Sequence, residues 1–326
     1  MFILTLVAGT LITVSSNSWL GMWMGLEINL LSIIPLMESV KNQSESEASM
    51  KYFITQAIAS SILMLAIIMI MQESMMSSTK STIMNTAILT KMGAAPFHFW
   101  FPEVIEGLSW FNSLIMLTWQ KIAPMVIMMY SNKTMMFLTA SIIASMMISG
   151  IMGINQTSLR KIMAYSSINH IGWMISSTLM IQSIWMLYLV IYSIISMAII
   201  MIMKFNNTFK MNQLTTTLNE SKSMKMLFIL NFLSLGGIPP FLGFFPKWIT
   251  INFLIENKFT MMTFLMILMT LMTLYFYMRI TFSSLILMTS ETVTKIKMNN
   301  KSFMIMTLNI ILLSSLMMCT MTLNFV

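Results

Sequence analysis

Apolar stretches long enough to cross a membrane recur along this whole chain of 326 residues. A helix needs about 17–25 predominantly apolar residues to span the ~30 Å hydrocarbon core of a bilayer. We therefore predict about eleven transmembrane helices and no separate soluble domain. The longer polar connections are predicted at 41–49, at 204–225 and from Glu291 to Lys301. The predicted spans are 1–18, 20–38, 51–71, 82–100, 108–130, 134–153, 161–180, 184–203, 226–246, 260–285 and 302–322.

The composition places most of the chain's surface in lipid. Hydrophobic residues make up 57% of the sequence and charged residues 9%, whereas a globular protein carries roughly 25% charged residues. This balance excludes an ordinary soluble enzyme and a disordered chain. Methionine is unusually frequent at 44 residues. We favour codon bias over a metal-binding role, because Met is an acceptable lipid-facing residue.

Several chemistries are disfavoured by what the chain lacks. Its single cysteine, Cys319, cannot form a disulfide framework or supply the roughly four ligands of an iron–sulfur cluster. Two histidines and no aspartate leave little material for a metal site or a Ser/His/Asp triad. The sequence contains neither a G-x-G-x-x-G turn nor a P-loop for a nucleotide. The net charge of +8 is scattered between apolar runs and forms no stripe for nucleic acid.

The distribution of basic residues predicts the orientation of the helices. The N-terminus shares a side with the even-numbered loops, so we expect it to face the cytoplasm or its organellar equivalent. The opening segment MFILTLVAGT has no basic or Arg-rich leader, so we expect neither a secreted nor an imported precursor. The opposite side carries Lys80, Lys133 and Lys258. The N-terminal side carries Lys41, Lys51, Arg160, Lys161, Lys204, Lys210, Lys222, Lys225, Lys295, Lys297 and Lys301.

Two predicted spans are interrupted by proline and glycine. The fourth contains KMGAAPFHFW (91–100) and the ninth contains LGGIPPFLGFFPKW (235–248). If 1–130 is one five-helix unit and 134–285 a second, with a loop and a last helix in 286–326, the broken helix is fourth in each unit. Five is odd, so the second unit would insert upside down. Broken helices at matching positions of inverted repeats indicate an ion or substrate path near the midplane.

Four ionisable residues lie inside predicted spans, where a charge costs at least ~2.5–3.5 kcal/mol on insertion scales. They are Glu27, Lys91, Lys121 and Lys247. Desolvation lowers the pKa of a buried lysine, and an approaching carboxylate raises it again, so such a lysine can load and release a proton. Arginine would stay protonated. We interpret the four as candidate proton-transfer groups. The alternatives are a helix-packing carboxylate at Glu27 and snorkelling to the membrane surface at Lys121 and Lys247.

Prolines near the three lysines are expected to leave backbone carbonyls without helical donors. Freed carbonyls and unwound turns can hold water in an otherwise dry interior, and a proton moves along water. The carbonyls in question are those of Met92, Gln120, Leu235 and Gly236, freed by Pro96, Pro124, Pro239 and Pro240 respectively.

The two histidines are weaker candidates. His98 follows the predicted kink at Pro96, and His170 lies in AYSSINHIGW (164–173). Either could relay protons. Alternatively, His98 hydrogen-bonds at the interface and His170 is a packing residue satisfied by Ser166 or a carbonyl. We expect solvated positions for Glu103 and Glu106 and an interface anchor at Arg279.

Several segments together resemble the NADH dehydrogenase subunit 2 family, the mitochondrially encoded, antiporter-like subunits of respiratory complex I. The resemblance covers nearly the whole chain and is most specific through 91–124. It implies two inverted five-helix repeats without the three extra leading helices of longer bacterial relatives. The segments are GLEINLLSIIPLM (25–37), KYFITQAIASS (51–61), KMGAAPFHFWFPEV (91–104), LTWQKIAP (117–124), NQTSLRKIMAYSSINHIGWM (155–174), GGIPPFLGFFPKW (236–248) and LYFYMR (274–279).

The resemblance also implies roles and partners. Glu27 is expected to pair with Lys91, Lys121 to pass the proton along a hydrated axis, and Lys247 to be the terminal exchange site. NADH, FMN, Fe–S clusters and ubiquinone are expected in other subunits, so this chain would bind no cofactor. The expected neighbours are subunits 4 and 4L, accessory subunits and membrane lipid. The expected location is the mitochondrial inner membrane, with the N-terminus in the matrix and the C-terminus in the intermembrane space.

The leading hypothesis is therefore a proton-translocating subunit of complex I, driven by quinone reduction elsewhere in the complex. A free-standing cation/proton antiporter module is a related alternative. A passive scaffold that only holds neighbouring subunits is an alternative from a different class.

Overall fold

The described part of the chain is built from helices, as its composition predicts. The computed structural model describes residues 1–286 apart from 39–41, 73–76, 132–133, 181 and 220–221. Within those residues, extended backbone pairs at one isolated bridge, between Ser158 and Lys210. The predicted helix at 302–322 and the loop that precedes it lie outside the described residues.

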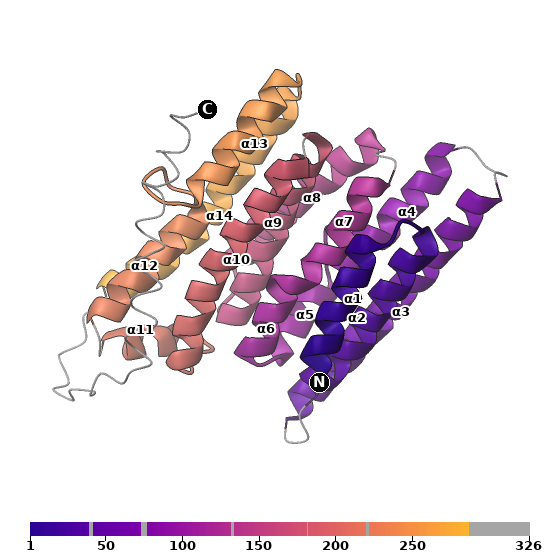
Figure 1. The fold of residues 1–326 in the computed structure, drawn as a ribbon. Helices are drawn as coiled ribbons and strands as arrows, with labels where there is room; N and C mark the ends of the chain where they lie inside the picture. The colour runs from indigo at the N-terminus through magenta and orange to yellow at the C-terminus, as the bar shows by residue number, and fades with distance from the viewer. Residues whose placement is uncertain (39–41, 73–76, 132–133, 181, 220–221, 287–326) are drawn as a thin grey trace. The chain divides into compact units, whose positions relative to one another are not determined.

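Backbone contacts divide the chain into two compact units, Met1–Ser145 and Met146 onward. The first unit, indigo to magenta in Figure 1, contains α1 (Phe2–Ser15), α2 (Trp19–Met37), α3 (Gln43–Met71), α4 (Ser77–Met92), α5 (Trp100–Gly107), α6 (Trp110–Leu117), the 3₁₀ turn η1 (Trp119–Lys121) and α7 (Ile122–Tyr130). The boundary falls within α8 (Met135–Ile154). The second unit contains α9 (Leu159–Met180), α10 (Gln182–Phe205), α11 (Met211–Asn219), α12 (Lys222–Gly236), α13 (Phe244–Glu256) and α14 (Thr260–Ile286).

Six stretches of helix within the described residues are long and apolar enough to cross a membrane. Each coincides with a predicted span, so the chain is an all-helical, multi-pass membrane protein. Two further apolar helices are shorter, Phe2–Ser15 and Met224–Gly236. The six are Trp19–Met37, Gln43–Met71, Trp110–Tyr130, Met135–Ile154, Gln182–Phe205 and Thr260–Leu285.

Helix α9 is polar for a membrane helix, yet it is buried along nearly its whole length, from Ile162 to Leu179. Its serines satisfy their hydroxyl groups within the helix: Ser166 Oγ donates to the carbonyl of Met163 at 2.7 Å. This back-bonding removes the cost of burying a hydroxyl. Helix α9 contacts α10, α13 and α14, so neighbouring helices surround a polar segment that lipid would not tolerate.

The helix bounds depart from the sequence-based prediction at two connections and at the ninth span. The connection predicted at 41–49 is wrong, because α3 begins at Gln43, where the Asn42 side chain donates to Glu45 Oε1 at 3.2 Å. The connection at 204–225 contains the short helix α11. The ninth span, predicted at 226–246, extends as helix to Glu256 on the far side of its break.

Helices α1 and α2 approach closely through small residues. A Cβ atom added at Gly25 of α2 would lie 2.8 Å from the backbone nitrogen of Thr13 and 2.9 Å from the carbonyl oxygen of Gly9. Small residues allow such close backbone approach between membrane helices, where packing rather than the hydrophobic effect drives association. This contact fixes the helix that carries Glu27.

We expect Gly25→Ala to lower the thermal unfolding midpoint of the detergent-solubilised chain. The added methyl group would meet backbone atoms that cannot rotate away, and overpacking of this kind costs about 1–3 kcal/mol. Gly236→Ala is the control, because its Cβ would lie 3.6 Å from the nearest atom, in the ring of Tyr277. Equal midpoints for the two variants would contradict the close packing of α1 on α2.

Candidate functional site

Both interruptions predicted from proline and glycine are present. Helix α4 ends at Met92 and α5 begins at Trp100. Helix α12 ends at Gly236 and α13 begins at Phe244. Each break begins with a glycine of positive φ, 72° at Gly93 and 81° at Gly237, a conformation that glycine adopts without steric cost.

The two breaks share one backbone pattern. The amide of Ala94 donates to Leu89 at 3.1 Å, and the amide of Ile238 donates to Leu233 at 3.4 Å. The next turn repeats as well, since Phe97 donates to Ala94 at 2.9 Å and Phe241 donates to Ile238 at 2.9 Å. The same local fold therefore occurs once in each unit.

The sequences of the two breaks align without a gap, which inspection of the prolines alone had missed. GAAPFHFWFPE (93–103) matches GIPPFLGFFPK (237–247) in the pattern G-x-x-P-F-x-x-x-F-P. The last aligned position carries opposite charges, Glu103 in the first unit and Lys247 in the second. Comparing the two proline-containing segments residue by residue would have revealed this exchange.

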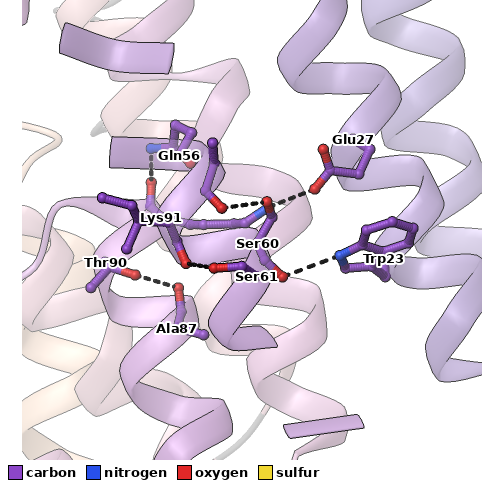
Figure 2. A network of polar contacts seen from close by, with 10 residues as sticks. Trp23, Glu27, Gln56, Ser60, Ser61, Ala87, Thr90 and Lys91 are labelled. Carbon is purple, nitrogen blue, oxygen red and sulfur yellow. Dashed lines mark hydrogen bonds and ion pairs between the residues drawn. The ribbon is translucent and has the colours of Figure 1, made fainter. Parts of the chain in front are cut away.

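Lys91 and Glu27 form an ion pair in the first unit, in which the lysine is buried and the carboxylate is partly exposed. Lys91 lies in the last turn of α4 and Glu27 lies on α2. Lys91 Nζ is 4.0 Å from Glu27 Oε1, and the side chains are 4% and 26% exposed. Figure 2 shows the lysine reaching past α3 toward the carboxylate. The pair is too long for a hydrogen bond, and Glu27 Oε1 accepts none from the described protein atoms.

Helix α3 holds both sides of this pair. Gln56 Nε2 donates to the carbonyl of Lys91 at 3.2 Å. The indole N–H of Trp23, one turn before Glu27, donates to the carbonyl of Ser60 at 3.2 Å (Figure 2). These bonds hold α2 and α4 against α3 on both sides of the ion pair.

Lys121 is buried at a third helix interruption, which the sequence-based prediction lacked. The predicted span 108–130 is present as Trp110–Tyr130, and within it the 3₁₀ turn Trp119–Lys121 separates α6 from α7. Lys121 is 2% exposed, and its Nζ lies 6.0 Å from the ring centroid of Phe101 on α5. The preceding Gln120 donates to Asn29 Oδ1 on α2 at 2.8 Å.

Lys247 is buried beside the break of the second unit. Its Nζ donates to the carbonyl of Gly236 at 2.8 Å and to that of Leu235 at 3.4 Å. These are the two carbonyls that Pro239 and Pro240 were predicted to free. Lys247 is 6% exposed and points into the unit, so it does not snorkel.

The two histidines have different surroundings. His98 Nδ1 lies 3.3 Å from the carbonyl oxygen of Pro96, inside the first break. His170 Nδ1 is 2.8 Å from the Tyr188 hydroxyl, and the centroid of its ring is 4.9 Å from the ring centroid of Tyr192. The partner expected for His170, Ser166, instead donates to its own helix.

A small cavity of about 10 Å³ lies against the His170 ring, which is about the volume that one water molecule requires. Its lining includes Tyr188 and Tyr192 from α10, and Leu235 and Pro246 from either side of the break. Polar groups on α9 and α10 therefore lie near the carbonyls that bind Lys247.

Other predicted residues lie outside these clusters. Glu103, expected to be solvated, forms an exposed ion pair with Lys51 at 2.6 Å. Arg279, expected to be an interface anchor, donates to the carbonyl of Gln156 at 3.1 Å. Across the described residues, no group of three or more His, Cys, Asp or Glu side chains could hold a metal ion.

Comparison with known proteins defines the class of this chain. A family model described as NADH:quinone oxidoreductase/Mrp antiporter, transmembrane, matches residues 16–273. A chain of respiratory complex I from Thermus thermophilus has the same fold, with a TM-score of 0.85 at 19% identity over 96% of this chain and 76% of that chain. The family match and the fold therefore define an antiporter-like membrane subunit.

Two relatives narrow the class to a family. NADH-ubiquinone oxidoreductase chain 2 of Anopheles gambiae is 47% identical over 98% of this chain and 96% of its own length. The chain 2 protein of Locusta migratoria is 45% identical over 100% of this chain and 96% of its own length. The chain belongs to the NADH-ubiquinone oxidoreductase chain 2 family, the antiporter-like subunits of the membrane arm of complex I.

We expect Gln120→Leu and Asn29→Leu each to lower the thermal unfolding midpoint of the detergent-solubilised chain. Each substitution leaves one buried amide without its partner, which costs about 1–3 kcal/mol. The double variant should lose less than the sum of the two single losses, because residues in contact are coupled. Strictly additive losses would show that this bond does not hold the Lys121 turn to α2.

Proposed function

We propose that this subunit moves protons across the mitochondrial inner membrane through Glu27, Lys91, Lys121 and Lys247, driven by quinone reduction elsewhere in complex I. The observation that carries the proposal is the pair of buried Lys91 and partly buried Glu27, 4.0 Å apart in a membrane-spanning unit. An intramembrane charge is costly and pairs with a neighbour, so by default it marks a transport path.

The attraction between Lys91 and Glu27 is similar in size to the work of moving one proton across the membrane. Opposite unit charges 4 Å apart attract by about 4 kcal/mol at an effective dielectric constant near 20. Moving one charge against ~150 mV costs about 3.5 kcal/mol. A movement that separates Glu27 from Lys91 therefore changes the proton affinity of the lysine by about the amount that one transfer requires. Helix α3 braces the backbones while the two side chains move.

The later steps follow the other buried amines. We assign Lys121, at the interruption between α6 and α7, to onward transfer, and Lys247 to terminal exchange. His98, in the first break, and His170, bonded to Tyr188 at 2.8 Å, are the candidate relays. Their support is burial, since His98 is 3% exposed and His170 is 5% exposed.

We also propose the architecture that this path requires. Two inverted five-helix repeats, 1–130 and 134–285, precede the last helix in 286–326, giving about eleven spans. The shared turn after Gly93 and after Gly237 supports an internal repeat. The basic residues favour an N-terminus in the matrix and a C-terminus in the intermembrane space. Subunits 4 and 4L are the proposed neighbours, and NADH, FMN, Fe–S clusters and ubiquinone are assigned to other subunits.

We expect Lys91→Met and Glu27→Gln to allow complex I to assemble while proton pumping per electron falls about tenfold. Each change removes the attraction of about 4 kcal/mol that sets the proton affinity of the lysine, which is more than the roughly 1.4 kcal/mol that corresponds to a factor of ten. The measurement is quenching of a pH-sensitive dye in proteoliposomes, divided by the rate of NADH oxidation.

Lys51→Met is the matched control. It also removes a lysine from a Lys–Glu pair, but that pair is exposed, with side-chain exposures of 54% and 56%, and exposed pairs contribute about 0–1 kcal/mol. We expect it to pump normally. If Lys91→Met and Glu27→Gln pump as well as Lys51→Met, the subunit is a passive scaffold.

A further inference from the structure

The partner of Lys247 is the carbonyl end of a helix, whereas the partner of Lys91 is a carboxylate. Lys91 forms an ion pair with Glu27 in the first unit. The Lys247 amine instead donates to the carbonyls of Gly236 and Leu235 at 2.8 and 3.4 Å. These belong to the last turn of α12, where the aligned peptide dipoles leave a partial negative charge of about half a unit.

Gly237 packs against the side chain of Lys247. A Cβ atom at Gly237 would be 2.9 Å from both Cδ and Nζ of Lys247 and 3.2 Å from Cε. Such distances are shorter than van der Waals contact, so an added methyl group would displace its neighbour. The neighbour is the flexible end of a lysine and not backbone, so the displacement would fall on the amine.

We propose that Gly237 is a positioning residue, which holds the Lys247 amine on the carbonyl end of α12 so that this helix end acts as its counter-charge. The charged amine donates to the two carbonyls, and the neutral amine leaves them. This inference rests on the proposed role of Lys247 in proton exchange. It adds the group that faces the lysine and the residue that makes room for it.

The first unit shows that the backbone turn alone does not explain the contact. Gly93 begins the equivalent turn with a φ of 72°. A Cβ atom there would meet the Phe101 side chain at 3.0 Å, and no lysine is among its three nearest atoms. The turn requires a glycine in both units, whereas contact of the glycine with a lysine is found at Gly237.

The test measures proton pumping by assembled complex I as a function of pH. In Gly237→Ala, the alkaline limb of the pumping profile should move to lower pH by about one unit, because an amine pushed off its acceptors loses charge-assisted hydrogen bonds. Gly237→Asn should shift the limb similarly. Asn adopts the left-handed backbone more readily than Ala, so a shared shift reflects the added Cβ and not backbone strain.

Gly93→Ala is the matched control, because it imposes the same backbone conformation on an alanine at the aligned position. Its alkaline limb should stay where the unsubstituted chain has it. An unmoved limb in both Gly237 variants, or an equal shift in Gly93→Ala, would overturn the inference. Failure of both Gly237 variants to assemble would also overturn it, because the glycine would then serve the fold.

Lys247→Met separates this inference from the function on which it rests. Full pumping in Lys247→Met would remove Lys247 from the proposed path. Lost pumping in Lys247→Met, together with unshifted profiles in both Gly237 variants, would keep Lys247 in the path and overturn only the positioning role of Gly237.

Discussion

A charged amine inside a membrane protein needs a polar partner that the chain itself supplies, and this requirement organises both units. Each of the three lysines of the candidate site lies at a helix interruption. Lys91 is in the last turn of α4, Lys121 ends the 3₁₀ turn between α6 and α7, and Lys247 faces the end of α12. An unbroken helix uses its own backbone groups, so it has none to offer. A break in a helix leaves backbone carbonyls without helical donors, and a buried lysine beside the break can use them as hydrogen-bond acceptors.

The two units meet this requirement in different ways. Around the first break, neutral side chains donate hydrogen bonds to the backbone carbonyls. The Gln56 amide donates to the carbonyl of Lys91, and the Trp100 indole donates to the carbonyl of Thr90. The amine of Lys91 therefore pairs with the carboxylate of Glu27 on another helix. In the second break, Lys247 itself takes the carbonyls. One partner is a side chain that can move away, and the other is fixed backbone. The same turn therefore accompanies a side-chain partner for the lysine in one unit and a backbone acceptor in the other.

The sequence allowed the helical fold and both broken helices to be predicted, because apolar length and proline act locally. It also indicated all three lysines as buried, since a charge inside an apolar run has few explanations. The 3₁₀ turn at Lys121 was missed because no glycine marks it. Pro124 lies in the first turn of α7, where proline is tolerated, so its presence does not by itself indicate a break in the helix.

Partners across helices were harder to predict. The sequence contains several hydroxyl groups close to His170, and Ser166 was the nearest choice along the chain. The bond goes to Tyr188, 18 positions away on the next helix, because Ser166 is already satisfied by its own backbone. The carbonyls that bind Lys247 could be predicted, because proline removes helical donors at a fixed spacing. The proximity of Glu27 to Lys91 depends on the packing of three helices and came only from resemblance to a family.

The most direct test of the central claim is a structure of the intact complex at a resolution that shows ordered water. The account predicts a chain of waters that reaches the amines of Lys91, Lys121 and Lys247, each amine facing the protein interior. Amines in dry surroundings with no water between them, or turned toward the lipid headgroups, would contradict it.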